Sequence, residues 1–243
     1  MRIAVIDADP ITYICSKDEL DDSLLRAESL IQNALNATHC THYYMFLSDT
    51  PYFRHRVNAE YKDKRPPSSL LYLKEIKEHL KTKFGAVSYP GLEADDLNAY
   101  VMYTNQANFE DTYINMSIDK DVIKSVWGEW FNYKKYEKGE TLFDDALKFI
   151  FIQALMGDST DNIKGIPKVG EVKATKMISE CSNVNEMRTR VLAEYCKYYK
   201  SSSVGIYEFQ KNFRQVYLLR KQQDFLNEVG YIPELPTLRK GFS

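Results

Sequence analysis

Short apolar runs and longer amphipathic segments alternate along the first half of the chain. Four apolar runs have the length of buried strands and are predicted at residues 2–8, 43–47, 86–89 and 112–118. Between them, apolar positions recur at helical spacing over residues 20–36 and 70–84, and Glu93 begins another predicted helix. This alternation favours an α/β fold with a mainly parallel, doubly wound sheet flanked by helices.

The second half has a weaker strand signal and a stronger helical one. A strand is predicted over residues 127–136, with a turn at Lys138-Gly139, and a helix over residues 143–156. A Gly- and Pro-rich segment and further helices follow, with a flexible break expected at residues 200–205 and a surface tail over the last fifteen residues. We therefore expect an α/β core at residues 1–155, with an exposed basic segment at residues 50–69, and a helical lobe at residues 156–243.

Composition is that of an ordinary globular protein. Of the 243 residues, 44% are hydrophobic and 27% are charged, and no apolar run approaches the roughly 20 residues that a membrane span requires. The apolar stretch before Asp7 is too short for a signal peptide, so a cytoplasmic protein is expected. The cysteines lack a Cys-x-x-Cys spacing, which indicates neither a zinc site nor a disulfide framework.

Aspartates follow three of the predicted strands. Asp7, Asp49 and Asp119 each come just past the carboxyl end of an apolar run. In an open α/β sheet these ends share one edge, and binding sites are built there. We therefore expect three residues that are far apart in sequence to converge.

Further acidic residues lie in short motifs, and the full candidate set is Asp7, Asp49, Glu93, Asp95, Asp96, Asp119, Asp121, Asp158 and Asp161. Two like charges about 4 Å apart repel by roughly 4 kcal/mol at an effective dielectric near 20, so a cluster of this size needs bound cations. Oxygen ligands without His or Cys favour Mg²⁺ or Mn²⁺ over zinc. Each motif alone also has a structural explanation, because acids at a helix start interact favourably with the helix dipole.

Basic residues gather apart from the acidic motifs, although the formal net charge is only −2. Five of them fall within twelve positions of the exposed segment, namely Arg54, Arg56, Lys62, Lys64 and Arg65. A second basic stretch runs from Lys197 to Lys221. Both a solvated surface and a phosphate-binding surface are compatible with these patterns.

A glycine-containing loop, GIPKVG at residues 165–170, precedes a predicted helix. Backbone N–H groups in such a loop, together with the dipole of the following helix, attract phosphate.

The acidic motifs, in this order, and the stretch MGDSTDNIKGIPKVG at residues 156–170 resemble the flap-endonuclease and 5′–3′ exonuclease family. The resemblance covers residues 2–176 and is greatest to the short phage-encoded members. It implies a PIN-like fold and a helix–three-turn–helix that includes residues 165–174, which holds the duplex backbone and often uses a bound K⁺ ion. Where the family commonly has a glycine in this loop, the chain has Lys168.

The resemblance also implies roles for individual residues. Asp7, Asp49, Glu93, Asp95 and Asp96 would hold one Mg²⁺ or Mn²⁺ ion, and Asp119, Asp121, Asp158 and Asp161 would hold or orient a second one. Asp119 and Asp158 would be catalytic, together with Lys62 and Arg65 beside the scissile phosphate. The expected nucleic-acid contacts are Arg54, Tyr61, Lys62, Arg65, Lys164, Gly165, Lys168, Gly170 and Lys173. Asp9 is interpreted as a local cap and is left out of the set.

These expectations define a monomeric, metal-dependent 5′–3′ exonuclease and flap endonuclease acting on DNA with little sequence preference, in a host cell if the chain is phage-encoded. Removal of RNA primers is a further expectation. The alternatives are a PIN-type ribonuclease, which would not need the loop at residues 165–170, and a catalytically silent DNA-binding module, which would not need to keep every acidic residue.

Overall fold

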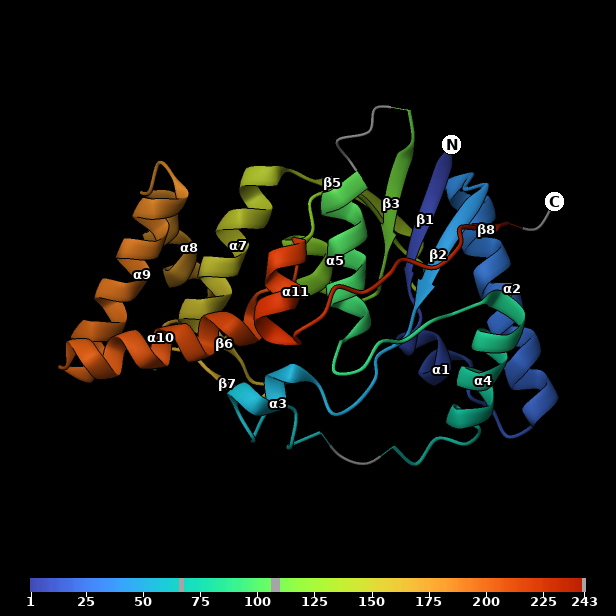
Figure 1. The fold of residues 1–243 in the computed structure, drawn as a ribbon, viewed down its shortest axis with the longest axis horizontal. Coiled ribbons are helices and arrows are strands. Elements are labelled where there is room, and N and C mark those ends of the chain that lie inside the picture. The colour runs from blue at the N-terminus through green and yellow to red at the C-terminus, as the bar shows by residue number, and fades with distance from the viewer. Residues whose placement is uncertain (66–67, 106–109, 242–243) are drawn as a thin grey trace. The chain divides into compact units, whose positions relative to one another are not determined.

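The computed structural model of the protein describes residues 1–65, 68–105 and 110–241 (Figure 1). The chain forms two compact units. The sheet unit comprises Met1–Tyr52, Ser68–Thr141 and Leu219–Ser243, and the helical unit comprises Phe53–Pro67 and Leu142–Leu218. Each unit therefore contains segments from distant parts of the sequence, whereas the sequence predicted one boundary at residues 155–156.

The sheet unit is built on strands in the order β5-β4-β3-β1-β2-β8. Strands β1 to β4 are parallel, and the edge strands β5 and β8 run antiparallel to their neighbours. The bounds are Arg2–Asp7 (β1), His42–Phe46 (β2), Thr112–Met116 (β3), Gly128–Asn132 (β4), Glu137–Thr141 (β5) and Arg239–Lys240 (β8). The mainly parallel sheet with flanking helices confirms the predicted fold class.

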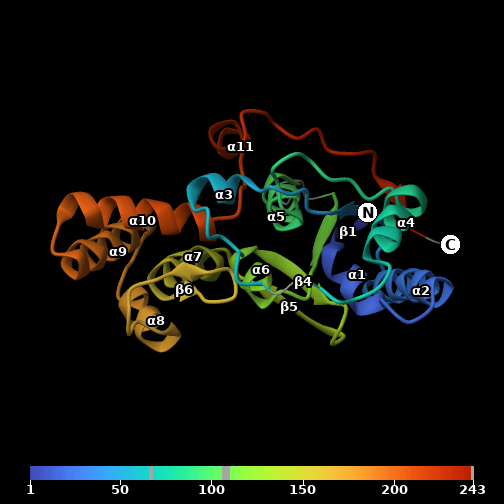
Figure 2. The same ribbon diagram turned by 90° about the horizontal axis from the view of Figure 1, so that it is seen from below.

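Helices cover both faces of this sheet (Figure 2). On one face, Ala4 and Ile6 of β1 share a hydrophobic core with residues of α1, α2 and α4. On the other face, the Asn98 side chain of α5 donates to the Val5 carbonyl oxygen at 3.1 Å and to the Asn115 side-chain oxygen at 2.9 Å. The bounds are Asp9–Cys15 (α1), Leu20–Thr38 (α2), Leu73–Phe84 (α4), Ala94–Asn105 (α5), Lys120–Ser125 (α6) and Gln222–Glu228 (α11). With both faces covered, polar residues at the strand ends lie at the carboxyl edge of the sheet.

Two predicted strands differ from the structure. Residues 86–89 form only an isolated bridge between Val87 and Phe46. The predicted turn at Lys138-Gly139 is wrong, because the hairpin turns earlier, where the Asn132 side-chain oxygen accepts the backbone N–H groups of residues 134 and 135. Gly139 lies instead within β5, where a β-carbon would be 2.6 Å from the Trp130 ring. The glycine thus marks close packing inside a strand rather than a turn.

The helical unit contains α3 (Phe53–Val57), α7 (Phe143–Met156), α8 (Glu171–Ser179), α9 (Val184–Tyr199), α10 (Ser202–Val216) and a short hairpin of β6 (Gly157–Asp158) and β7 (Ile163–Lys164). The α7 helix begins and ends at the predicted residues and is apolar around most of its circumference, so α8, α9 and α10 all pack against it. A buried hydroxyl fixes one of these contacts, since Tyr195 donates to the Ala154 carbonyl oxygen at 2.5 Å.

The predicted flexible break at residues 200–205 is a tight corner between α9 and α10. Lys200 ends α9 in the left-handed conformation, and the Ser201 hydroxyl accepts the Val204 N–H at the start of α10. A β-carbon at Gly205 would lie 2.5 Å from the Cys196 backbone. The glycine therefore permits close helix packing, and the serines begin a helix rather than a linker.

The C-terminal segment returns to the sheet unit. Tyr231 donates its hydroxyl to the Pro90 carbonyl oxygen at 2.8 Å, and β8 pairs with β2. The expected surface tail is thus partly an edge strand; its residues 242–243 lie outside the described part of the chain, as do residues 66–67 of the basic segment. No helix among the described residues is long and apolar enough to cross a membrane.

Candidate metal centre and nucleic-acid contacts

Asp7 lies at the end of β1 with its side chain buried. Its carboxylate accepts the Ser117 hydroxyl at 3.2 Å and the Asp9 N–H at 3.3 Å. Burial, followed by repulsion from Asp9 and Asp119, raises the pKa of Asp7 to about 8. An ionised Asp7 is therefore costly in this protein unless a cation is bound beside it.

Asp119 lies at the end of β3 and caps α6. Its carboxylate accepts the Asp121 N–H at 2.7 Å, while its own N–H donates to the Ser117 hydroxyl at 3.1 Å. Ser117 therefore contacts both Asp7 and Asp119 and links the ends of β1 and β3. Sequence reasoning missed this residue, because a serine in an apolar strand gives no sign of what it will contact.

Asp9 makes long-range contacts rather than the expected local cap. One oxygen accepts the Ser48 N–H at 2.9 Å, and the other lies 2.9 Å from the Lys77 ammonium nitrogen. Helix α1 has no side-chain cap. Asp9 therefore connects the ends of β1 and β2 and adds its charge to the environment of Asp7. The spacing Asp7-Ala8-Asp9 was the available signal for including it.

The acids around the start of α5 are held inside the sheet unit. Glu93 and Asp96 are buried, and Asp95 is half-buried. Asp96 accepts the Leu219 N–H at 3.1 Å through one oxygen and the Glu93 N–H at 3.4 Å through the other. Burial, followed by the charges of Asp7, Asp9 and Asp95, raises the pKa of Tyr133, whose hydroxyl donates to the Asp7 carbonyl oxygen at 2.8 Å. Asp95 and Asp7 therefore both interact with Tyr133.

Asp49 follows β2 on the same edge. Its N–H donates to the Leu92 carbonyl oxygen at 3.0 Å, and its charge contributes, after burial, to raising the pKa of Tyr231 to about 12. Asp9 and Asp119 thus both act electrostatically on Asp7, whereas Asp49 acts on Tyr231. Among the described residues, no three acidic, histidine or cysteine side chains are already arranged as a metal site.

The donor chemistry of the strand-end residues still fits a hard divalent cation. All the candidate side chains are carboxylates, and one of the buried ones, Asp7, has its ionised form destabilised first by burial and then by two neighbouring carboxylates. A bound divalent ion would remove that penalty.

Asp161, in the helical unit, has basic partners. Its carboxylate forms an ion pair with Arg65, lies 3.6 Å from the Lys62 ammonium nitrogen and accepts the Tyr61 hydroxyl at 3.2 Å. The Lys62 N–H also donates to the Asp161 carbonyl oxygen at 3.0 Å. The two predicted catalytic cations, Lys62 and Arg65, thus both form ion pairs with Asp161. Asp158 begins the hairpin and accepts the Thr160 N–H at 2.8 Å.

Two predicted nucleic-acid contacts lie inside the helical unit. Arg54 is 1% exposed and donates to the carbonyl oxygens of Gln215 and Tyr217, both at 2.9 Å. Tyr61 is 4% exposed. In this conformation Arg54 joins α3 to the end of α10, and the Tyr61 ring is packed rather than offered to a base.

The loop at residues 165–170 is shaped by glycines. A β-carbon at Gly157 would lie 2.2 Å from the Gly165 backbone nitrogen, and one at Gly165 would lie 2.2 Å from the Met156 backbone. Lys168 has a φ of 65° and Gly170 precedes α8 with open space around it. The predicted contact residues Lys164, Lys168 and Lys173 are all exposed. An open loop before a helix is an arrangement suited to phosphate.

Comparisons by sequence and by structure both find proteins named as 5′–3′ exonucleases or flap endonucleases. No family model matches the sequence. The chain is 30% identical over 162 residues to a 5′–3′ exonuclease of Buchnera aphidicola, covering 60% of the chain and 55% of that protein. It is also 30% identical over 121 residues to the flap endonuclease of Escherichia phage T5, covering 46% of the chain and 42% of that protein.

The structure of the T5 flap endonuclease in a pseudo-enzyme-product complex with DNA and metal ions matches with a TM-score of 0.69 at 19% identity, covering 88% of the chain and 89% of that structure. In sequence the chain is similar to members of the flap-endonuclease and 5′–3′ exonuclease family. The likeness at 19% identity shows the fold of the family alone. The chain spans about half the length of the curated relatives it matches.

Proposed function

We propose that this protein is a divalent-metal-dependent 5′ nuclease that hydrolyses phosphodiester bonds in DNA. The observation that carries the proposal is the burial of the Asp7 carboxylate at the carboxyl ends of β1 and β3, where it accepts the Asp9 N–H and is linked to Asp119 through Ser117. A site that raises the energy of its own anionic form is one that favours cation binding. The T5 relative, which has the same fold, was crystallised with DNA and metal ions, and this supports the choice of substrate.

The strand-end carboxylates are the proposed ligands. Asp7, Asp49, Glu93, Asp95 and Asp96 would hold one Mg²⁺ or Mn²⁺ ion, and Asp119, Asp121, Asp158 and Asp161 a second one. Two bound ions would supply an activated water and stabilise the leaving 3′ oxygen in an in-line displacement. Ser117 would fix the orientation of Asp7 and Asp119, since it contacts both. The assignment of Asp158 and Asp161 depends on the resemblance alone.

Residues of the helical unit would handle the DNA backbone. Lys62 and Arg65, which pair with Asp161, would stabilise charge that develops on the scissile phosphate. Backbone N–H groups around Gly165 and Gly170, with Lys164, Lys168 and Lys173 beside them and a K⁺ ion in the loop, would hold a duplex phosphate. Contacts of this kind give affinity that depends on salt and little on sequence.

The resemblance supports a finer proposal: exonucleolytic hydrolysis from 5′ ends and cleavage of 5′ flaps, with removal of RNA primers, by a monomer in the cytoplasm. The decisive test is digestion of 5′-labelled and 3′-labelled duplex and flap DNA, and of matching RNA–DNA hybrids, with Mg²⁺ and with EDTA. Metal-dependent release from the 5′ end is expected. Cleavage restricted to single-stranded RNA would favour a PIN-type ribonuclease, and binding without cleavage would favour a silent DNA-binding module.

A further inference from the structure

A cavity of about 590 Å³ opens in the helical unit between α3, α7, α9 and α10. Its volume is within the range of roughly 300–1,000 Å³ that small-ligand sites occupy. None of the residues named above as metal ligands, catalytic cations or duplex contacts lines it. The cavity is thus a separate feature of this unit.

Four basic side chains line the cavity, one from α3, one from α9 and two from α10: Arg56, Arg188, Lys211 and Arg214. No acidic residue is among the lining residues in the part of the chain that the structure describes. Glu60 interacts electrostatically with Lys211, but its carboxylate pairs with Lys164 at 3.1 Å. The cavity is therefore suited to an anion, and its guanidinium groups suit the geometry of phosphate.

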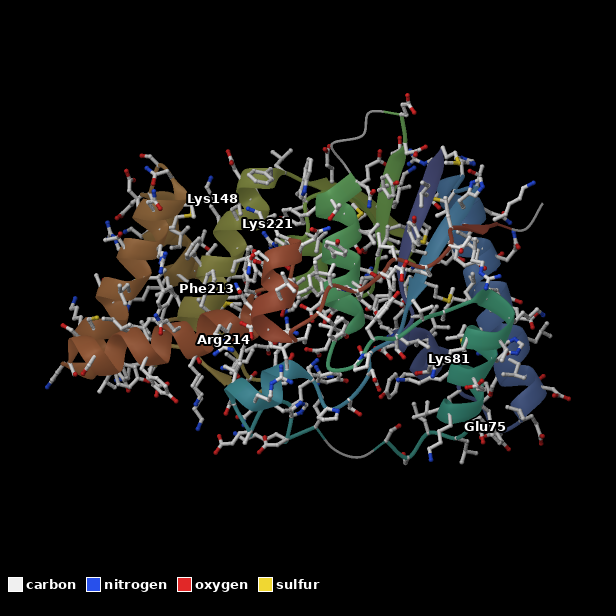
Figure 3. The ribbon with its side chains drawn as sticks, viewed as in Figure 1. Glu75, Lys81, Lys148, Phe213, Arg214 and Lys221 are labelled. Atoms are coloured by element: carbon white, nitrogen blue, oxygen red, sulfur yellow. The ribbon has the colours of Figure 1, made fainter. Side chains whose placement is uncertain are left out.

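Four aromatic residues also line the cavity, namely Phe151, Tyr207, Phe209 and Phe213. Phe213 lies with its ring centroid 5.5 Å from that of Phe151 and 5.6 Å from that of Phe209. Tyr207 is 61% exposed although it lines the same cavity. Figure 3 labels Phe213 and Arg214, which are adjacent on α10 and bring an aromatic ring and a guanidinium group to one place. Aromatic rings beside cations fit a ligand that has both a ring and a phosphate.

We propose that this cavity binds one nucleotide unit, with the base against the aromatic wall and the phosphate at the arginines. Stacking on aromatic side chains combined with phosphate contacts is how proteins hold single-stranded nucleic acid without reading its sequence. The nucleotide could come from two sources with the same chemistry, a free mononucleotide or one residue of a single strand. The proposal does not require the cleavage proposed above, because no metal ligand takes part in it.

Binding is measured in EDTA, so that failure of the nuclease proposal cannot affect the result. The probes are thymidine 5′-monophosphate, thymidine, inorganic phosphate and a ten-residue oligothymidylate, titrated calorimetrically at low salt. The monophosphate is expected to bind at one site per chain and more tightly than either thymidine or phosphate. Competition between the monophosphate and the oligonucleotide would assign both to the cavity; binding of one alone would identify the source.

Substitutions at two exposed residues test the proposed contacts to the phosphate and to the base separately. Arg188→Gln is expected to weaken binding of the monophosphate about tenfold, as loss of a charge-assisted contact does. Tyr207→Ala is expected to weaken it several-fold and to leave the affinity for inorganic phosphate unchanged. Matched controls lie outside the cavity lining: Arg190→Gln on α9, whose guanidinium pairs with Glu180 at 3.4 Å, and Tyr198→Ala, also exposed.

The proposal is overturned if neither nucleotide probe binds, or if phosphate binds as tightly as the monophosphate. It is also overturned if the controls lose as much affinity as Arg188→Gln and Tyr207→Ala, because the binding site would then lie elsewhere on the unit. Circular dichroism of each variant establishes that it remains folded, which the exposure of the two tested side chains leads us to expect.

Discussion

The two acidic regions of this protein have opposite electrostatic arrangements. At the strand ends of the sheet unit, Asp7 is buried with Asp9 and Asp119 as its charged neighbours, and its pKa is raised. In the helical unit, Asp161 is surrounded by Lys62, Arg65 and the Tyr61 hydroxyl. In the first region the Lys77 ammonium group pairs with Asp9 while the pKa of Asp7 stays raised, whereas in the second region Lys62 and Arg65 both pair with Asp161 itself.

Two kinds of acidic motif therefore look alike in sequence but differ in what they indicate about metal binding. A carboxylate with internal cationic partners can be stable without metal, so its presence gives weak evidence for a metal site. A buried carboxylate next to others is destabilising by itself and is explained best by a function. The strand-end residues therefore carry more of the functional argument than Asp161 does.

The largest effect is expected from Asp7→Asn. Loss of the buried charge should lower the single-turnover rate with Mg²⁺ by at least about 10³-fold, because the ion loses a ligand worth several kcal/mol to the transition state. The same substitution should raise the melting temperature in EDTA at pH 8, since asparagine has no charge to bury. Cleavage of a labelled flap substrate and thermal melting measure the two effects.

Asp22→Asn is the matched control, because Asp22 is an exposed acid in the first turn of α2. It should change neither cleavage nor melting appreciably. An Asp7→Asn protein that cleaves normally would exclude Asp7 from the metal centre.

A pH dependence of stability is the next effect. The Asp7 carboxyl has a pKa near 3.8 in the unfolded chain and about 8 in the folded one. Between these values the folded state binds more protons, so the free energy of unfolding of the metal-free protein should fall as pH rises from about 4 to 8. The expected loss is on the order of a few kcal/mol.

Urea unfolding in EDTA at pH 6 and pH 8.5 measures this loss. Mg²⁺ should reverse it, and more strongly at the higher pH. If Asp7→Asn shows the same slope as the wild type, the pH dependence belongs to other groups.

Lys62→Ala tests the function of the cations that pair with Asp161. We expect a decrease of about 10²-fold in single-turnover rate, because a positive charge facing the transition state is lost, with duplex affinity within about threefold of wild type. Lys64→Ala is the control in the same segment, since Lys64 is exposed. Equal rates for Lys62→Ala and wild type would leave Lys62 as no more than a partner of Asp161.

The smallest effect is expected from Lys168→Gly. Lys168 has a left-handed backbone, so glycine should raise the free energy of unfolding by up to about 1 kcal/mol. If the ammonium group contacts phosphate, duplex affinity should fall a few-fold and the slope of log affinity against log salt should decrease by about one. Unchanged affinity and slope would show that Lys168 does not contact DNA.

The sequence predicted the sheet and its acidic edge because both depend on local patterns. The apolar runs before Asp7, Asp49 and Asp119 show where strands end, and parallel strands share an edge. Ser117 and Asp9 could not be assigned in the same way, because their roles depend on partners from other strands and helices. A serine within an apolar run has the same pattern whether it contacts two carboxylates or none.

The basic segment also contains a residue whose environment could not be predicted from sequence. Arg54 lies in a polar, Pro-containing stretch that is typical of an exposed loop. It is buried because it donates to two carbonyl oxygens at the end of α10, about 160 positions away in sequence. Hydrophobicity patterns predict burial of apolar residues, whereas burial of an arginine depends on unpaired acceptors that only the folded chain brings close.

The contact between Gly157 and Gly165 limits the sequence changes that this part of the protein can accept. Because each glycine leaves no room for a side chain, the hairpin that carries Asp158 is fixed against the end of α7. The position of Asp158 relative to Gly165 at the start of the loop is therefore fixed by this contact. A shift of the acidic group relative to the loop would require insertion or deletion of residues, since substitution at either glycine would separate the two backbones.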